Sequence, residues 1–206
     1  TSFSNLHARI SDLKGYADIL GDTYDLDCEL DHSLNLGARH TLIWGLQYKL
    51  NTISEDLYFA QARAHNLFAF FVEDEWALTP RLKLTLGTRW DTHPMVGNHL
   101  SPRVSLFFKP QLHHVFRFSI SKAYRNPSLF NSYVQLTASS TDIPAPWPVE
   151  YGIEGNPHLK SEEVIAYELG YYARTRRACT FTLNLFYKKY SHFIDTIPEM
   201  EYAVPG

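Results

Sequence analysis

Few of the side chains that could do chemistry are grouped together in this chain of 206 residues. Among its ten histidines, His93 and His99 bracket one predicted loop and could bind a metal ion or haem there, although loop histidines are more often simply solvated. The sequence contains no G-x-S-x-G, no H-E-x-x-H and no P-loop. Its two cysteines, Cys28 and Cys179, are interpreted as small apolar residues rather than as a disulfide. We therefore expect no enzymatic activity, no resident metal and no cofactor.

The densest group of ionisable residues is the stretch YDLDCELDH at 24–32. Its acidic residues alternate with apolar ones, and in an extended strand successive side chains point to opposite faces. One face then carries Asp25, Asp27, Glu29 and Asp31, and the other carries Tyr24, Leu26, Cys28 and Leu30. The stretch predicts a strand with one acidic face and one apolar face.

The same alternation recurs along the chain. In 82–92, for example, Leu84, Leu86 and Trp90 oppose Thr85 and Arg89. The pattern predicts strands over 24–32, 40–50, 66–78, 82–92, 101–109, 112–125, 163–174 and 179–189, with a further, poorly defined strand over 1–11. No stretch of similar length has the helical period of about 3.6 residues. We therefore expect an all-β chain of about eight or nine antiparallel strands.

The connections between these strands alternate in length. Short ones are expected near 32–39, 79–81, 109–112 and 175–177, and long ones over 12–22, 51–65, 93–100 and 126–162. Strands of about eleven residues, tilted by about 40°, span an apolar band of about 25 Å. This layout favours an up-and-down transmembrane β-barrel, with the apolar faces toward lipid and the carboxylates solvated in a water-filled lumen. The alternative is a soluble β-sandwich or propeller with the apolar faces in its core.

Composition supports the same class of protein. The net charge is −3 and aromatic residues make up 15% of the chain, so no basic field favours nucleic acid as a partner. Aromatic residues at the apolar parity are candidates for the girdles at the two edges of the membrane. They are Trp44, Tyr48, Trp76, Trp90, Tyr124 and Tyr187.

Two longer phrases carry a family resemblance. The first, SISKAYRNPSLFNSY at 119–133, contains Ser121, Lys122, Ala123, Tyr124, Arg125, Pro127 and Ser128. The second, GNPHLKSEEVIAYELGYY at 155–172, contains Gly155, Asn156, Pro157, Leu159, Glu162, Tyr167, Glu168, Gly170 and Tyr171. In type and order these residues resemble two motifs of the TonB-dependent receptor family of outer-membrane active transporters, although Ser161 replaces the family's usual proline. The resemblance extends over about residues 24 to 195.

The resemblance implies a particular architecture. Members of this family have a 22-stranded barrel closed around an N-terminal plug domain, which is preceded by a short TonB box. The whole chain, 1–206, would then be an incomplete slice of the barrel domain, with about eight or nine of the strands and without the plug or the C-terminal strands. We therefore expect it to be a fragment or a partial gene product.

The resemblance also implies a function. Such receptors bind a scarce solute outside the cell, such as a ferric siderophore, haem or cobalamin, and import it with energy from the TonB–ExbB–ExbD complex. The expected partners are outer-membrane lipid, that complex and a small-molecule or metal-chelate ligand, in the outer membrane of a Gram-negative bacterium. A passive, porin-like channel would need neither plug nor energy coupling and is the first alternative. An outer-membrane enzyme or a surface adhesin is the second.

Candidate ligand-binding residues lie in and beside the connection at 126–162, which we expect on the extracellular side. At about 37 residues it is longer than compact domains usually tolerate without a function. Trp147 and Tyr151 lie among prolines there and could stack on a flat ligand, and Arg125 could pair with an anionic chelate. Glu168 and Gly170, on the polar parity of their strand, suit either ordinary barrel wall or the close approach of an internal domain.

Overall fold

The computed structural model describes residues 2–13, 23–53, 62–139, 149–174, 179–195 and 199–202. These residues form two antiparallel sheets, of nine and three strands, and one short helix. The all-β prediction is therefore confirmed. Within the described ranges, no helix has the length and apolar content needed to cross a bilayer.

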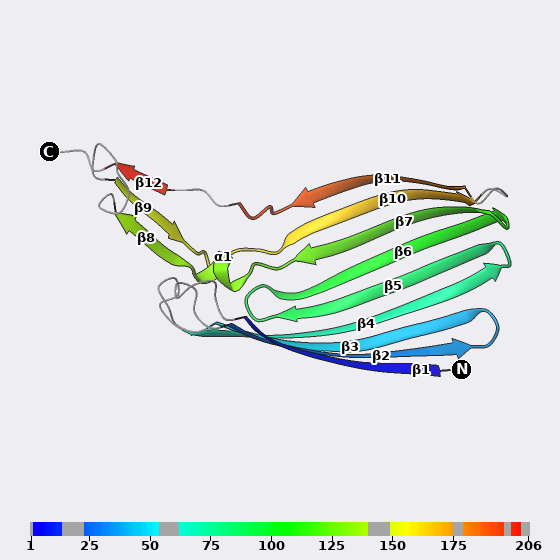
Figure 1. Cartoon of the computed structure of the whole chain (residues 1–206), viewed down its shortest axis with the longest axis horizontal. Helices are drawn as coiled ribbons and strands as arrows, with labels where there is room; N and C mark the ends of the chain where they lie inside the picture. The colour runs from blue at the N-terminus through cyan, green and yellow to red at the C-terminus, as the bar shows by residue number, and fades with distance from the viewer. Residues whose placement is uncertain are drawn as a thin grey trace.

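The large sheet is a curved meander in which neighbouring strands run in opposite directions (Figure 1). Its strands in spatial order are β1 (Ser2–Leu13), β2 (Thr23–Leu36), β3 (His40–Ile53), β4 (Arg63–Thr79), β5 (Leu82–His93), β6 (Gly97–Gln111), β7 (His114–Arg125), β10 (Glu162–Arg174) and β11 (Thr180–Ser191). The up-and-down order is the predicted one. The poorly defined strand at the start of the chain is real, because β1 pairs with β2 along its whole length.

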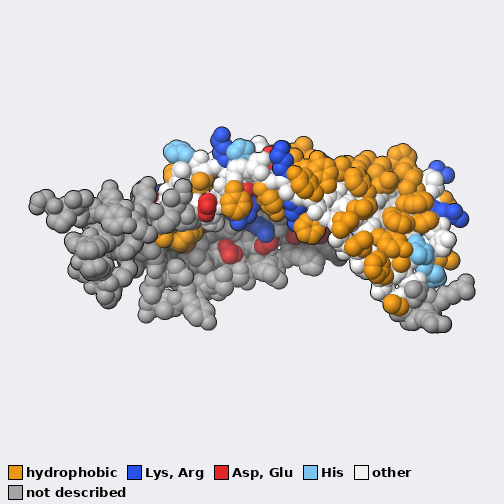
Figure 2. Space-filling model, turned by 90° about the horizontal axis from the view of Figure 1, so that it is seen from above, with side chains coloured by type: hydrophobic (Ala, Val, Ile, Leu, Met, Phe, Trp, Pro, Cys, Tyr) orange, Lys and Arg blue, Asp and Glu red, His pale blue; other side chains and the backbone are white. Residues whose placement is uncertain are grey.

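The two faces of the large sheet differ as the alternation predicts. On the face with the apolar parity, here called the outer face, large side chains such as Tyr48, Leu86 and Trp90 are exposed. On the opposite, inner face, Thr85 and Ser119 are only 5% and 3% exposed. Figure 2 shows apolar side chains gathered over one side, with acidic and basic side chains in the hollow beside them. An exposed apolar face opposite a polar one is the reverse of a soluble sandwich and is typical of a barrel wall.

The outer face is not wholly apolar. Asp74 of β4 lies on it, and its Oδ2 is 2.9 Å from Nδ1 of His40 on β3. The His40 ring also stacks on Trp76, with 5.3 Å between ring centroids. Both residues lie near the turns at the ends of their strands. A polar pair is tolerated there because the rim of the sheet is where polar groups can reach water.

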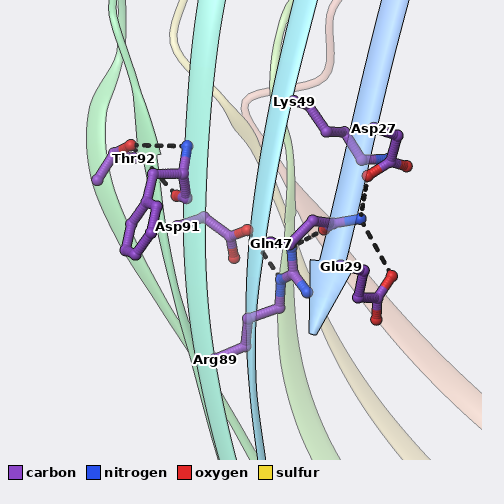
Figure 3. Close-up of polar contacts among 8 residues, drawn as sticks. Asp27, Glu29, Gln47, Lys49, Arg89, Asp91 and Thr92 are labelled. Carbon is purple, nitrogen blue, oxygen red and sulfur yellow. Dashed lines mark hydrogen bonds and ion pairs between the residues drawn. The ribbon is translucent and has the colours of Figure 1, made fainter. Parts of the chain in front are cut away.

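The acidic row of β2 lies on the inner face, where it meets polar side chains of the next strands (Figure 3). Lys49 of β3 forms an ion pair with Asp27, with 3.0 Å between Nζ and Oδ2, and Gln47 Nε2 donates to Asp27 Oδ1 at 3.0 Å. Arg89 of β5 reaches across β4 and donates from Nη2 to Gln47 Oε1 at 2.6 Å. The β4 residue beside Gln47 is the small Ala69, which leaves room for this reach. The expectation that the row is simply solvated is therefore wrong for Asp27, which belongs to a polar network across the wall.

The short turns gather at one end of the sheet (Figure 1). They join β2 to β3 at 37–39, β4 to β5 at 80–81 and β6 to β7 at 112–113. At the opposite end, the long loop predicted at 93–100 is wrong, because β5 runs to His93 and β6 begins at Gly97. Gly97 has φ +81°, a conformation that glycine adopts without steric cost and that closes a three-residue hairpin loop. The connections predicted at 12–22, 51–65 and 175–177 lie wholly or largely outside the described residues.

The connection predicted at 126–162 contains regular structure. It holds helix α1 (Leu129–Tyr133) and a hairpin of β8 (Gln135–Ser139) and β9 (Val149–Glu154). Strand β12 (Glu199–Tyr202) pairs with β9 and completes the small sheet. Figure 1 places α1 and the small sheet beyond the ends of β7 and β10 that lie opposite the short turns. The prediction of a bare loop was wrong because these elements are too short to show a periodic pattern.

Candidate functional site

The two sequence phrases that carry the family resemblance meet where β7 ends and β10 begins. Arg125 and Glu162 are direct partners across these strands. The guanidinium donates twice to the carboxylate, from Nε at 2.5 Å and from Nη2 at 2.6 Å. The backbone N–H of Ile194, beyond β11, donates to Glu162 as well, at 2.7 Å. Glu162 thus links the end of β7, the start of β10 and the segment after β11. It is 6% exposed, so these contacts are shielded from solvent.

Helix α1 begins immediately after this point for local reasons. Pro127 cannot donate to a strand ladder, so pairing along β7 stops before it. Ser128 is the N-cap of α1: its Oγ accepts from the backbone N–H of Asn131 at 3.1 Å, and the Asn131 side chain accepts from the backbone N–H of Ser128 at 3.2 Å. This reciprocal cap satisfies donors that a five-residue helix would otherwise leave open. The first phrase thus encodes a strand end followed by a helix start.

The second phrase packs against that helix. The backbone N–H of Gly155 donates to Val134 O at 2.7 Å, and that of Asn156 donates to Asn131 O at 3.0 Å. A Cβ atom on Gly155 would collide with the backbone of residues 132–134, so only glycine permits this approach. Asn156 Oδ1 then accepts from the backbone N–H of His158 at 2.9 Å. The two ends of the segment between β7 and β10 are therefore fastened to each other.

A pocket of about 460 Å³ lies beside these fastened ends. Its lining includes His99 of β6, Tyr124 of β7 and Ser161. The ladder between β6 and β7 extends no further toward this end than Arg103 opposite Ser121. Beyond it the His99 ring stacks on Tyr124, with 4.4 Å between centroids.

Ser161, the residue that replaces the family's proline, completes this contact between β6 and β7. Its Oγ donates to Asn126 Oδ1 at 2.7 Å and lies 2.7 Å from His99 Nε2. Ser161 is 7% exposed. Because a proline has no hydroxyl, neither contact could form with the family's usual residue.

A second pocket, of about 300 Å³, lies at the C-terminal end of α1. The guanidinium of Arg63, at the start of β4, lies over the Tyr133 ring at 4.6 Å from its centroid. The His65 ring makes edge contacts with Tyr133 and with His93, at centroid distances of 6.3 Å and 5.0 Å. Aromatic and cationic side chains thus hold the end of α1 against the start of β4 and the end of β5.

Farther along β7 and β10, other residues of the two motifs contact neighbouring residues of the barrel wall. Glu168 faces inward and accepts from Arg117 Nη2 at 3.1 Å, and a Cβ on Gly170 would lie 3.2 Å from Asn184 Oδ1. Tyr167 lies on the outer face next to Tyr187 of β11. Ser121 and Ala123 lie opposite Ala166 and Val164 in the β7–β10 ladder. Leu159 lines the first pocket, and Pro157 lines both pockets.

Of the three predicted ligand-binding residues, the structure describes the side chain of Arg125 alone, so the prediction stays a prediction. Arg125 is 67% exposed in its side chain but is paired with Glu162. Tyr151 lies on β9, where its backbone pairs with Ala138 and Met200, and Trp147 lies outside the described residues. The structure describes the backbone of β9 around Tyr151. Arg125 stays a candidate for ligand binding because its side chain is exposed.

The two histidines considered as a metal or haem pair have different neighbours. His93 is 6% exposed and contacts His65, whereas His99 contacts Tyr124 and Ser161. The expectation of solvated loop histidines is therefore wrong for His93, because the turn at 94–96 places it at the end of a strand. Among the described residues, no group of three or more His, Cys, Asp or Glu side chains is placed to hold a metal ion. Neither Cys28 nor Cys179 is in a disulfide within the described structure.

Sequence reasoning missed Arg63, Tyr133 and Asn126. No periodic signal marks them, since each acts through a contact between segments far apart in the chain. The Asn-Pro-Ser order at 126–128 was the available clue, because Pro and Ser are typical of a helix start.

Comparison with known proteins gives a consistent family. The model of the TonB-dependent receptor-like β-barrel matches residues 2–205. Over 133 residues the chain is 29% identical to an iron-regulated outer membrane virulence protein of Vibrio cholerae, covering 63% of this chain and 19% of that protein. Over 110 residues it is 32% identical to the ferric enterobactin receptor of Pseudomonas aeruginosa, covering 50% of this chain and 14% of that protein. The chain therefore spans less than a fifth of the length of these relatives.

Solved structures show the same fold. The siderophore receptor PirA of Pseudomonas aeruginosa superposes with a TM-score of 0.75 at 21% identity, over 91% of this chain and 35% of that chain. A ferric enterobactin receptor variant from the same organism superposes with a TM-score of 0.67 at 21% identity, over 82% of this chain and 27% of that chain. The nine-stranded meander is thus similar to part of these barrel walls.

Proposed function

The chain belongs to the TonB-dependent receptor family, and we propose that it forms part of the barrel wall of a receptor that imports a ferric siderophore across the outer membrane. The ligand class is supported by relatives named as ferric enterobactin and siderophore receptors. The whole chain would belong to the barrel domain of a longer protein. A plug domain of that protein would close the barrel, and the separate TonB–ExbB–ExbD complex would supply the energy for import. The family consists of receptors and transporters rather than enzymes.

One observation supports ligand capture by this part of the wall. The segment between β7 and β10 is fastened at both ends, by Arg125 to Glu162 and by Gly155 to the end of α1. A long segment on a fixed base loses less conformational freedom when its tip engages a ligand. The sequence of this segment contains Trp147 and Tyr151, whose flat rings suit an aromatic chelate.

The charges near this base suit an anionic chelate. Arg125 has an exposed side chain, and Arg63 lies over Tyr133 beside the second pocket. Arginine donates in a planar fork and stacks on aromatic faces, so it recognises flat, negatively charged ligands well. Haem and cobalamin also have flat faces, and the experiment below separates them from a ferric siderophore.

The test uses the intact receptor that contains this chain, produced in a Gram-negative strain lacking its own siderophore receptors. Binding of ferric enterobactin, haem and cobalamin is measured on whole cells, with Trp147 and Tyr151 both changed to Ala. We expect ferric siderophore binding to weaken at least tenfold, because each lost aromatic contact is worth about 1 kcal/mol or more. An unchanged dissociation constant at normal surface expression would remove the loop from ligand capture.

Two further arms complete the test. Tyr187→Ala removes an aromatic residue from the outer face and should leave binding unchanged. Uptake of radioactive iron should stop when TonB is deleted or when the proton gradient is dissipated. Uptake that continues without TonB would contradict energised import and would favour a passive channel instead.

A further inference from the structure

On β7 and β11, the two strands that flank β10, the apolar band of the outer face ends in a lysine, and this pair, Lys122 and Lys189, is here called the lysine row. Tyr167 of β10 lies between Ile120 of β7 and Tyr187 of β11. Two residues nearer the pocket end, Ile165 of β10 lies between Lys122 and Lys189. On β7 and on β11, the next outward-facing residue after the apolar or aromatic one is therefore a lysine.

The row carries an excess of positive charge. Lys122 forms an ion pair with Glu163, with 2.9 Å between Nζ and Oε2, and its ammonium lies 5.0 Å from the centroid of the Tyr124 ring. Lys189 is exposed, and among the described side chains it forms no ion pair. Two ammonium groups against one carboxylate leave one positive charge uncompensated. Figure 2 shows Lys, Arg and His side chains gathered where the apolar band stops.

The 460 Å³ pocket continues this surface beyond the row. Tyr124 and Glu163 belong to its lining, together with Lys160, His158 and His192. The β6–β7 ladder has already ended at this level, where the stack of His99 on Tyr124 bridges the two strands. A headgroup held by the lysine row would have polar and basic side chains above it and an apolar band below.

We infer that Lys122 and Lys189 hold the phosphate of a lipid headgroup in the outer leaflet of the outer membrane. The inference rests on the outer face meeting lipid. Lysine side chains at the edge of an apolar band extend along it and place their ammonium groups at the level of the headgroups. Strands lie about 4.8 Å apart, so two lysines separated by one strand can converge on a single phosphate. The acyl chains would then lie along Ile120, Tyr167 and Tyr187.

The experiment compares two adjacent lysines that face opposite ways. In the β10–β11 ladder Lys189 is opposite Ile165 and Lys188 is opposite Ala166, so only Lys189 is on the outer face. The intact receptor is placed in phosphatidylcholine nanodiscs that contain a small share of phosphatidic acid, whose terminal phosphate is uncovered. The protein is released from the nanodiscs, and native mass spectrometry then counts the phosphatidic acid molecules that remain bound to it. We expect Lys189→Ala to lower retention about fivefold, and Lys188→Ala and Lys189→Arg to retain the lipid.

A second variant tests Lys122 without leaving the Glu163 carboxylate unpaired. Lys122→Met combined with Glu163→Gln removes the ion pair as a unit and should also lower retention. Equal retention in Lys188→Ala and Lys189→Ala would overturn the inference, because the lipid would then respond to net charge alone. Displacement of phosphatidic acid by millimolar inorganic phosphate would overturn the lipid as the occupant. Folding of each variant is checked by its heat-modifiable mobility on gels.

Discussion

Arg125 and Glu162 lie directly opposite each other across β7 and β10 and form a two-point ion pair, although they are 37 residues apart in the sequence. Each belongs to one of the two phrases that carry the family resemblance. Their pairing explains why both phrases are needed. The first ends one strand and starts a helix, the second returns the chain to the wall, and the ion pair sets the distance between them.

Changing this pair should loosen the base of the segment between β7 and β10. Arg125→Lys keeps the charge but loses the fork that donates twice, so it is not a conservative change here. We expect faster hydrogen exchange at the backbone amides of 128–134 and 155–161, with β3 and β4 unaffected. Lys83→Arg, which keeps the ion pair with Glu75 on the inner face, serves as the control. Unchanged exchange in Arg125→Lys would show that one contact between the two side chains is enough.

Neighbouring residues of a strand should report opposite surroundings. Leu46 and Leu84 lie on the outer face, and Gln47 and Thr85 on the inner face. Single cysteines in the intact receptor, labelled with a fluorophore, should be quenched by lipid-borne quenchers at 46 and 84 only. Quenching at 47 or 85 instead would reverse the assignment of the faces. Leu46→Arg, in the middle of β3, should cost about 2–4 kcal/mol of folding free energy, and Leu84→Arg should cost less because Leu84 pairs with Trp76 near the short turns.

Gly45 should not tolerate a side chain. A Cβ there would collide with the Phe71 ring and with Asp31, both fixed on neighbouring strands. Gly45→Ala should therefore lower the unfolding free energy of the intact receptor by about 1–3 kcal/mol, measured by urea unfolding in detergent. At Gly87 the nearest atoms belong to the flexible Glu73 side chain, 3.1 Å from an added Cβ. Gly87→Ala should consequently cost less, and a larger cost at Gly87 would contradict this account.

Ser161 should act through its hydroxyl. Ser161→Ala leaves Asn126 Oδ1 and His99 Nε2 without the partner they share. Asn126 and His99 are half-buried, so leaving them unpaired should cost about 1 kcal/mol, at the low end for an unmade hydrogen bond, and the thermal transition of the intact receptor should fall. Ser161→Thr keeps a hydroxyl and should restore most of the loss. If Ser161→Pro, which supplies the family's usual residue, matches the wild type, the hydroxyl contributes nothing measurable.

The strands and their faces were predictable from the sequence because the signal is local. In 82–92 the leucines and the tryptophan lie on the outer face and the charged residues on the inner face, and Thr85 is buried where Leu86 is exposed. The partners of those residues were not predictable. That Arg125 meets Glu162 depends on the register between β7 and β10, which is set by strand pairing and by what lies between the strands.

The connections were predicted less well. The segment 93–100 contains a proline and a glycine, which are typical of loops, yet positive φ at Gly97 lets the chain turn within three residues. Helix α1 is five residues long and depends on the Ser128 cap and on Gly155 packing against its end. Neither contact leaves a periodic trace, so the sequence predicts a loop where the structure has a helix and a hairpin.

The registers also restrict how the length of this chain can change. One residue inserted within β5 would turn every later side chain of that strand to the opposite face, whereas two inserted residues would restore the faces. Between Ala77 and Thr79, and between Phe108 and Gln111, the ladders already contain an irregular step next to a short turn, where an extra residue is accommodated. In related genes, insertions and deletions of odd length should therefore concentrate at these steps and between β7 and β10, and those inside strands should come in twos.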